Sequence, residues 1–287
     1  QRQMCIRDRL CPMRHLKPAL YVFALNVIIS IYLQLNNVLL GFMKDTEAVG
    51  YFTAATKIMV ITMSISSALG AVIMPRTSNL IAEERMDEFK ALVQKSYDFI
   101  FALAMPLMVG LIFTSPSAVL LLSGEGFVPA ILTSQIVAFN ILTVGLSGVM
   151  GIQVLYPLGK INIVILCTSI GAIINVFLNV LLIPRYGHNG TAVAYMLAEM
   201  TVTVSMFFIG KRYIPIRFLK RQHLNYVLGS VVMGVCLYFI SWLGLGNTAT
   251  LVMMISMGGI VYVVILLFLR DSIGMIPWKI LREKFGK

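Results

Sequence analysis

Long apolar blocks separated by short charged segments run through the whole chain. A transmembrane helix needs about 20 predominantly apolar residues to cross a bilayer, and eight blocks are of about this length. They cover residues 18–41, 51–74, 97–122, 129–155, 161–183, 190–210, 224–243 and 249–269. Membrane barrels use strands of only about 10 residues with alternating polarity, which these uniform blocks do not match. The pattern therefore predicts an all-α fold, a polytopic bundle of membrane helices.

The composition excludes an ordinary soluble protein. Hydrophobic residues make up 59% of the 287 residues and charged residues 12%, whereas a soluble domain carries about 25% charged residues. A net charge of +11 would suggest nucleic acid in a soluble protein, but here the cations lie between apolar blocks. We therefore expect no nucleic-acid partner. The four cysteines have no metal-ligand spacing, so we expect no zinc site and no disulfide framework.

Basic residues predict the orientation of the helices, because Lys and Arg near span ends gather on the cytoplasmic side. If the spans alternate in direction, one side receives nearly all cations and the other only Lys44 and Arg185. Both termini are therefore expected in the cytoplasm. Residues 78–95 predict an amphipathic helix on that face, and the basic stretch 211–223 is either an anchor or a binding site for anionic lipid head groups.

The pattern divides the chain into three parts. Residues 1–17 are basic and match neither a secretory signal nor a span; their first nine residues, QRQMCIRDR, look like translated sequencing-adapter sequence and are excluded from fold reasoning. Residues 18–210 hold six predicted spans in one bundle. Residues 211–287 add two further spans and a basic cytoplasmic tail.

Polar residues inside spans are costly in hydrocarbon and usually face a bundle interior or a water-filled cavity. On the first span, Asn26, Ser30, Gln34 and Asn37 fall within an arc of about 80°, with Asn36 off its edge. This stripe either lines a pathway or hydrogen-bonds to neighbouring helices.

Lys57 lies several residues inside the second span, where an ammonium group costs about 2.5 to 3.5 kcal/mol on insertion scales. Thr53, Thr56, Ser64 and Ser67 share its helix face within about 100°. The ammonium can hold a phosphate as a point charge. The alternative is a lysine close enough to the outer interface to extend its head group into water.

Other spans carry fewer candidates. Asn175 lies on a polar face of the fifth span, and Glu199, a lone deep acid in the sixth, either carries a coupling proton or has a structural role. Arg76 ends the second span as an anchor or as a guide for an anionic head group. We expect Asp98 to be interfacial. The three histidines, His15, His188 and His223, are scattered over termini and loops, and we expect no catalytic site, metal or cofactor.

Four stretches carry a family resemblance. They are LNNVLLGFMKDTEAVGYFTAATKI (35–58), IMPRTSNLIAE (73–83), YPLGK (156–160) and LIPRYGHNGTAVAYMLAE (182–199). Their order and spacing resemble polysaccharide flippases of the multidrug/oligosaccharidyl-lipid/polysaccharide exporter superfamily. The resemblance implies 14 helices, two bundles of six plus two at the C-terminus, of which the eight spans here match helices 7 to 14. The upstream helices of the same protein would then be a partner of this chain.

The resemblance also implies a function. Such proteins move undecaprenyl-diphosphate-linked oligosaccharide across the bacterial cytoplasmic membrane by alternating access, for O-antigen, capsule or exopolysaccharide. Membrane lipids and a polysaccharide polymerase would be further partners. At Asn36 related sequences often carry an acid, so no carboxylate role is expected there. Our hypothesis is that Lys57 binds the diphosphate; the residues expected to contact sugar are Asn26, Gln34, Asn37, Ser64 and Asn175.

Three alternatives remain open. A drug/cation antiporter of the same superfamily would concentrate acids in the membrane, and only Glu199 qualifies. A membrane enzyme of the same pathway, such as a polymerase or acyltransferase, would need a long, charged outer loop, whereas the predicted outer loops are short. A non-transporting scaffold would not require Lys57.

Overall fold

The computed structural model describes residues 34–214, 217 and 220–269, together with Leu16, Leu20, Phe23, Val27 and Ser30. This part of the chain consists of helices and the turns between them, without a strand. Residues 34–43 are helical, and the remaining elements follow in chain order. They are α2 (Thr46–Ala82), α3 (Met86–Ser123), η1 (Glu125–Phe127), α4 (Ala130–Val137), α5 (Phe139–Gly148), the π-helix η2 (Val149–Leu155), α6 (Ile161–Gly210), α7 (Arg221–Ser241) and α8 (Asn247–Phe268).

The prediction of a multi-pass α-helical membrane protein is confirmed. Five helices of the described part are long and apolar enough to cross a membrane: Met86–Ser123, Ala130–Leu155, Ile161–Gly210, Arg221–Ser241 and Asn247–Phe268. The second of these joins α4, α5 and η2. Helix α2, which holds the predicted second span, is not among the five.

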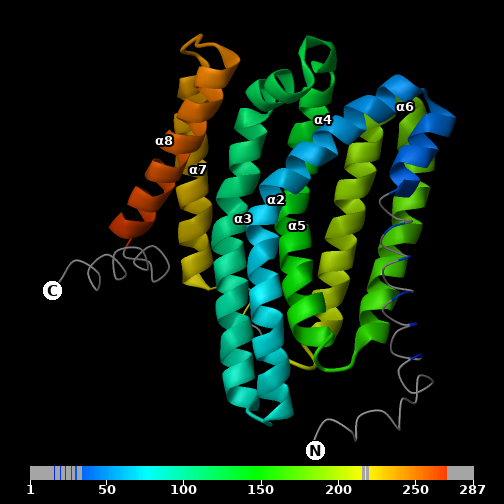
Figure 1. Cartoon of the computed structure of the whole chain (residues 1–287), viewed down its shortest axis with the longest axis vertical. Coiled ribbons are helices and arrows are strands. Elements are labelled where there is room, and N and C mark those ends of the chain that lie inside the picture. Colours follow the sequence, from blue (N-terminus) through cyan, green and yellow to red (C-terminus); the bar gives the residue numbers. More distant parts are fainter. Residues whose placement is uncertain are drawn as a thin grey trace, which may run out of the picture.

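Helix α6 contains two predicted spans, because its 50 residues reverse direction part-way. Gly187 has φ 55° and ψ −132°, a left-handed conformation that glycine adopts without a steric penalty. Pro184 precedes it and cannot donate a backbone hydrogen bond to the turn. Figure 1 shows the two limbs lying side by side, so the predicted spans 161–183 and 190–210 are the limbs of one reversing element.

The predicted amphipathic helix over residues 78–95 is wrong. The chain turns back at residues 83–85, and the segment is shared between the end of α2 and the start of α3. Glu84 has φ 60°, and the turn is closed by a hydrogen bond of 2.9 Å from Arg85 N to Leu80 O. Its apolar residues instead face a core, since Leu80, Phe89 and Val93 are buried together.

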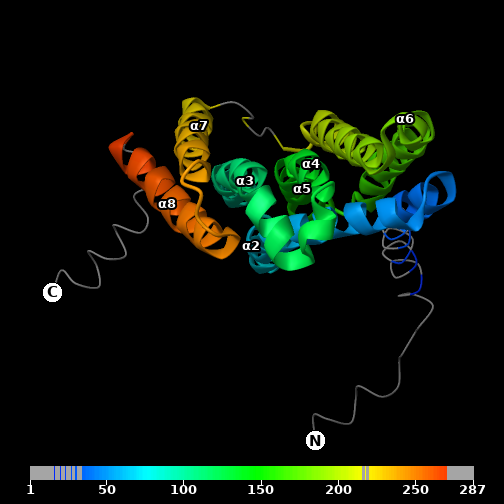
Figure 2. The ribbon, with the colours of Figure 1, turned by 90° about the horizontal axis from the view of Figure 1, so that it is seen from above.

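Helices α7 and α8 form a pair that packs on α3, at one side of the molecule (Figures 1 and 2). Helices α5 and α6 lie on the other side of α3, and α2 crosses them (Figure 2). Small residues allow close approach at the α3–α7 contact: a Cβ on Gly234 would lie 3.0 Å from side-chain atoms of Val109 and Phe113. Such small-residue contacts are typical of helices that associate in lipid.

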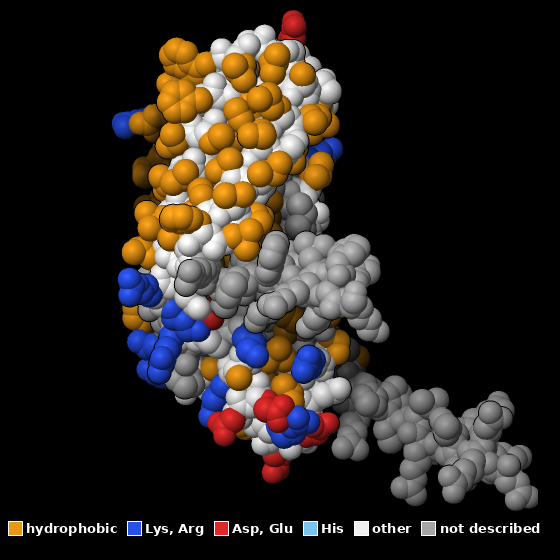
Figure 3. Space-filling model, turned by 90° about the vertical axis from the view of Figure 1, so that its left-hand side faces the viewer, with side chains coloured by type: hydrophobic (Ala, Val, Ile, Leu, Met, Phe, Trp, Pro, Cys, Tyr) orange, Lys and Arg blue, Asp and Glu red, His pale blue; other side chains and the backbone are white. Residues whose placement is uncertain are grey.

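One end of the molecule gathers the basic turns, and we call it the basic end. It comprises the turns at residues 83–85, 156–160 and 211–214 (Figure 1). On the face formed by α7 and α8, Figure 3 shows a broad hydrophobic surface with Lys and Arg side chains gathered below it. The exposed apolar side chains of α7 include Val231, Val232 and Val235. This distribution matches a helix bundle in lipid whose basic end lies at a membrane surface.

Candidate functional site

The polar face of α2 places Lys57 at the surface of the described part of the chain, where it makes no ion pair. Thr56 Oγ1 donates to Phe52 O at 2.9 Å within the same helix. Ser64 is exposed, and its Oγ donates to Ile61 O at 2.7 Å. Lys57 is therefore the charged group on this face that is available to an anion.

The predicted stripe on the first span is only partly described. Asn26 lies outside the described residues, and Gln34 is exposed. Asn37 is half-buried and accepts a hydrogen bond of 3.4 Å from Thr53 Oγ1 of α2. The two polar faces predicted from separate spans therefore meet at this pair.

Asn36, which the helical-wheel argument placed off the stripe, belongs to a buried polar cluster. Asn179 Nδ2 donates to Asn36 Oδ1 at 2.8 Å, to Asn175 O at 2.9 Å and to Asn175 Oδ1 at 3.1 Å. None of these three residues is more than 1% exposed. Asn175, expected from the sequence to contact sugar, thus lies inside a contact that joins the first span to α6.

Two further predicted site residues, Arg76 and Glu199, make none of the hydrogen bonds of this asparagine cluster. Arg76 is exposed on α2 and makes no ion pair with any described residue. Glu199 is half-buried on the second limb of α6. Its backbone carbonyl accepts a hydrogen bond of 2.8 Å from Thr203 Oγ1. That hydroxyl also lies 2.9 Å from Thr143 O and so connects α6 to α5.

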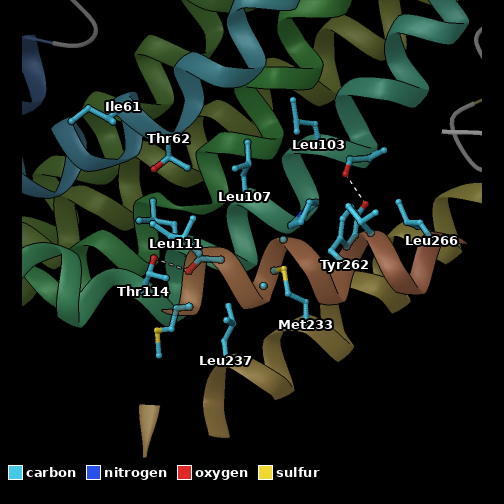
Figure 4. A pocket seen from close by; sticks show the side chains of 18 of the residues that line it. Ile61, Thr62, Leu103, Leu107, Leu111, Thr114, Met233, Leu237, Tyr262 and Leu266 are labelled. Carbon is cyan, nitrogen blue, oxygen red and sulfur yellow. Dashed lines mark hydrogen bonds between the residues drawn. The ribbon is translucent and has the colours of Figure 1, made fainter. Parts of the chain in front are cut away.

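An apolar groove of about 620 Å³ lies between α2, α3, α7 and α8, as Figure 4 shows. Its walls include Leu103, Leu107 and Leu111 of α3, Met233 and Leu237 of α7, and Leu266 of α8. The sequence did not predict this groove, because its walls come from predominantly apolar blocks in which nothing distinguishes a groove wall from a lipid-facing surface.

The hydroxyl groups that line the apolar groove are all engaged with backbone carbonyls. Tyr262 Oη donates to Ala102 O at 2.6 Å, Thr114 Oγ1 to Gly110 O at 2.8 Å and Thr62 Oγ1 to Ile58 O at 3.0 Å. None of the described residues that line it is charged. The groove therefore offers a ligand dispersion contacts and burial of apolar surface rather than hydrogen bonds.

A second polar group, which we call the Asp98 cluster, consists of Gln94, Asp98, Lys220 and His223. Asp98 Oδ2 lies 2.6 Å from Lys220 Nζ, and Asp98 Oδ1 lies 2.8 Å from Gln94 Nε2 and 3.0 Å from His223 Nε2. The sequence predicted Asp98 to be interfacial and His223 to be isolated in a loop. They are 125 positions apart, so no local spacing indicates their contact.

The end opposite the basic end holds a polar pocket of about 490 Å³, whose charged lining residues are Lys44, Asp45, Glu47 and Arg185. His188 also lines it, and its Nδ1 lies 2.8 Å from Thr133 Oγ1. Burial lowers the pKa of His188 below its ordinary value, against smaller opposing effects of the Asn189 hydrogen bond and the Asp45 charge. His188 is therefore held in its neutral form near neutral pH.

The sequence is similar to proteins of polysaccharide and glycan biosynthesis. A family model described as "Polysaccharide biosynthesis protein" matches residues 12–132. The chain is 24% identical over 237 residues to the probable low-salt glycan biosynthesis flippase Agl15 of Haloferax volcanii, covering 82% of this chain and 50% of that protein. The resemblance to polysaccharide flippases is confirmed. An uncharacterized membrane protein of Methanocaldococcus jannaschii is 21% identical over 60% of this chain and 34% of its own length.

The fold is similar to a solved flippase structure. The lipid II flippase MurJ, in an inward closed conformation, superposes with a TM-score of 0.75 at 17% identity, over 88% of this chain and 53% of that one. The chain thus spans about half the length of this structure and of the Haloferax relative. The Haloferax relative and the solved structure are both named as flippases.

Proposed function

We propose that this chain acts within a flippase that moves a prenyl-diphosphate-linked oligosaccharide across the membrane by alternating access. Transport without a catalytic step is part of the proposal. Such a substrate has an apolar tail and a charged, hydrophilic head. A protein that moves it must therefore accommodate both kinds of surface.

The apolar groove carries the proposal. Its hydroxyl groups already donate to backbone carbonyls, so they offer a polar ligand no free donor, whereas a hydrocarbon chain needs none. Methionine contributes an adaptable wall, since Met233 and Met254 can adjust to an irregular chain. A prenyl tail fits this chemistry and a hydrated cation or sugar does not.

The polar residues on the first two spans would hold the head group. In this proposal Lys57 binds the diphosphate, and Arg76 guides the anionic head group from the basic end. Glu199 carries the coupling proton. The sugar contacts predicted from the sequence, Asn26, Gln34, Asn37, Ser64 and Asn175, remain part of the proposal, and Asn175 would have to leave its buried cluster to reach a sugar.

The location and partners are also proposals. The basic end would face the cytoplasm with both termini of the chain, in a bacterial cytoplasmic membrane. Helices upstream of this chain would complete the cavity as helices 1 to 6 of a 14-helix protein, with the spans here as helices 7 to 14. A polysaccharide polymerase would receive the flipped oligosaccharide. O-antigen, capsule or exopolysaccharide would be its product.

Replacement of Lys57 by Gln in the complete protein tests the head-group assignment. We expect surface polysaccharide in a flippase-deficient strain to fall strongly, because the diphosphate loses its point charge. Lys90→Gln is the matched control: Lys90 pairs with exposed Asp87 at the basic end, and its loss should leave polysaccharide unchanged. Equal polysaccharide levels in both variants, at equal protein levels in the membrane, would exclude Lys57 as the diphosphate ligand.

A further inference from the structure

The Asp98 cluster lies where α7 and the segment before it meet the start of the groove-forming part of α3. Asp98 directly precedes Phe99, which lines the apolar groove, and Lys220 and His223 belong to the first turn of α7 and its N-cap. One turn beyond Asp98, the carbonyl of Ala102 accepts the hydroxyl of Tyr262 from α8. Polar contacts therefore tie both helices of the pair to one short stretch of α3.

Directional contacts are concentrated at this end of the groove. Further along, α7 meets α3 through apolar contacts, such as Gly234 beside Val109 and Phe113. Apolar contacts are non-directional, so they permit sliding and rotation. Hydrogen bonds to a charged group are short and directional. The Asp98 cluster can therefore fix the register of α7 on α3 where the apolar contacts cannot.

The charges within the cluster are matched. His223 Nδ1 accepts a hydrogen bond of 3.2 Å from Lys220 N, the N-cap of α7, so the ring proton is on Nε2 and points at Asp98. The Lys220 ammonium, whose Nζ lies 2.6 Å from Asp98 Oδ2, supplies the countercharge of Asp98. The side chain of Asp98 is 12% exposed and that of Lys220 26%. Loss of Lys220 would therefore leave the largely buried charge of Asp98 uncompensated.

The cluster also holds the segment that connects α6 to α7. Gln94 Nε2 donates to Asp98, while Gln94 Oε1 accepts a hydrogen bond of 2.8 Å from Arg217 N. Three aromatic rings surround the imidazole of His223: Phe101 at 4.7 Å, Tyr97 at 5.4 Å and Tyr226 at 6.1 Å between centroids. The imidazole has little room to reorient, which preserves the hydrogen-bond geometry.

We propose that Asp98, Lys220 and His223 are positioning residues that fix the α7–α8 pair against α3 and thereby set the width of the apolar groove. A buried ion pair is a poor source of stability compared with apolar packing, but it can specify one arrangement. The binding of a prenyl chain in the groove rests on the proposed function. The position of α7 itself can be measured without any substrate.

The test uses the whole chain in nanodiscs with its cysteines replaced, and spin labels at Leu122→Cys of α3 and Tyr238→Cys of α7. The variants are Asp98→Asn, Lys220→Met and the double variant, with Asp87→Asn as control, because Asp87 forms an exposed ion pair on the same helix. Pulsed electron paramagnetic resonance gives the distance distribution. Cross-linking to a photoreactive prenyl diphosphate measures occupancy of the groove, and thermal melting measures stability.

We expect a narrow distance distribution for the parent and Asp87→Asn chains and a broadened one for both single variants. Cross-linking should fall about tenfold or more in the single variants, because the groove is no longer held at one width. The double variant removes both charges, so its melting temperature should recover while its distance distribution stays broad. A recovered melting temperature with a broad distance distribution would show that the residues position α7 and do not merely stabilise the fold.

An unchanged distribution in folded Asp98→Asn and Lys220→Met chains would overturn the inference. So would a double variant that regains the narrow distribution together with its melting temperature. Broadened distances in a chain whose parent takes up no prenyl probe would support the positioning role and contradict the prenyl assignment of the groove instead.

Discussion

A polar side chain placed in the apolar groove should weaken prenyl binding by a calculable amount. Leu107 lines the groove on α3, and the nearby hydroxyls of Thr62, Thr114 and Tyr262 are already bonded to carbonyls. The carbonyl oxygen of an amide at position 107 would find no free donor among these hydroxyls once a hydrocarbon chain displaced water. Burial of an unpaired polar group costs about 1 to 3 kcal/mol in proteins, so Leu107→Asn should weaken binding about 5- to 150-fold.

The assay is competition of unlabelled prenyl phosphate with a photoreactive prenyl probe on the purified chain in nanodiscs. Leu122→Asn is the matched control, since Leu122 belongs to the same helix, does not line the groove and is 62% exposed. We expect the control to bind with the parent affinity. If Leu107→Asn and Leu122→Asn bind equally well, the groove is not where the prenyl chain sits.

Two further predictions concern stability. Asn179→Ala removes the donor shared by Asn36 and Asn175 and should cost about 1 to 3 kcal/mol, so thermal melting should fall by several degrees; an unchanged melting temperature would show that the cluster is not needed. Because burial lowers the pKa of His188, the unfolded chain binds the proton more tightly than the folded one. The stability it contributes is complete above about pH 6.5 and is lost as pH falls through the folded pKa. His188→Gln should therefore flatten the pH dependence of melting between pH 7 and pH 5, and a parallel loss in both chains would contradict this.

The sequence predicted the helices better than their contacts. Apolar block length is set by the thickness of the bilayer, so it located the spans from residue 97 onward, within the five long apolar helices. It also placed a loop between two spans where α6 reverses at Gly187. The amphipathic segment 78–95 failed because its apolar residues pack in a core beside a sharp turn at Glu84, which a pattern of charges does not reveal. The orientation and the division at residue 210 stay predictions.

Contacts between residues far apart in the sequence are the part of the site that the sequence could not predict. A helical wheel shows the faces of one helix and not its neighbours, so it gave no reason to include Asn36. Its hydrogen-bond partner, Asn179, is on α6, 143 positions away. The Asp98 cluster joins residues of α3 and α7, and only the packing of those helices brings them together. The Lys57 assignment came from one costly charge in a span, and it stays a prediction.

Transbilayer movement of the substrate by the complete protein is the most direct test of the proposed function. The complete reading frame would be expressed, purified and reconstituted in liposomes containing a fluorescent prenyl-diphosphate-linked oligosaccharide, whose outer-leaflet fraction is quenched chemically. We expect quenching of nearly all of the lipid within the assay with the parent protein and of only the outer-leaflet fraction with Lys57→Gln. Protein that is folded and correctly inserted but leaves the inner-leaflet fraction protected would contradict the account.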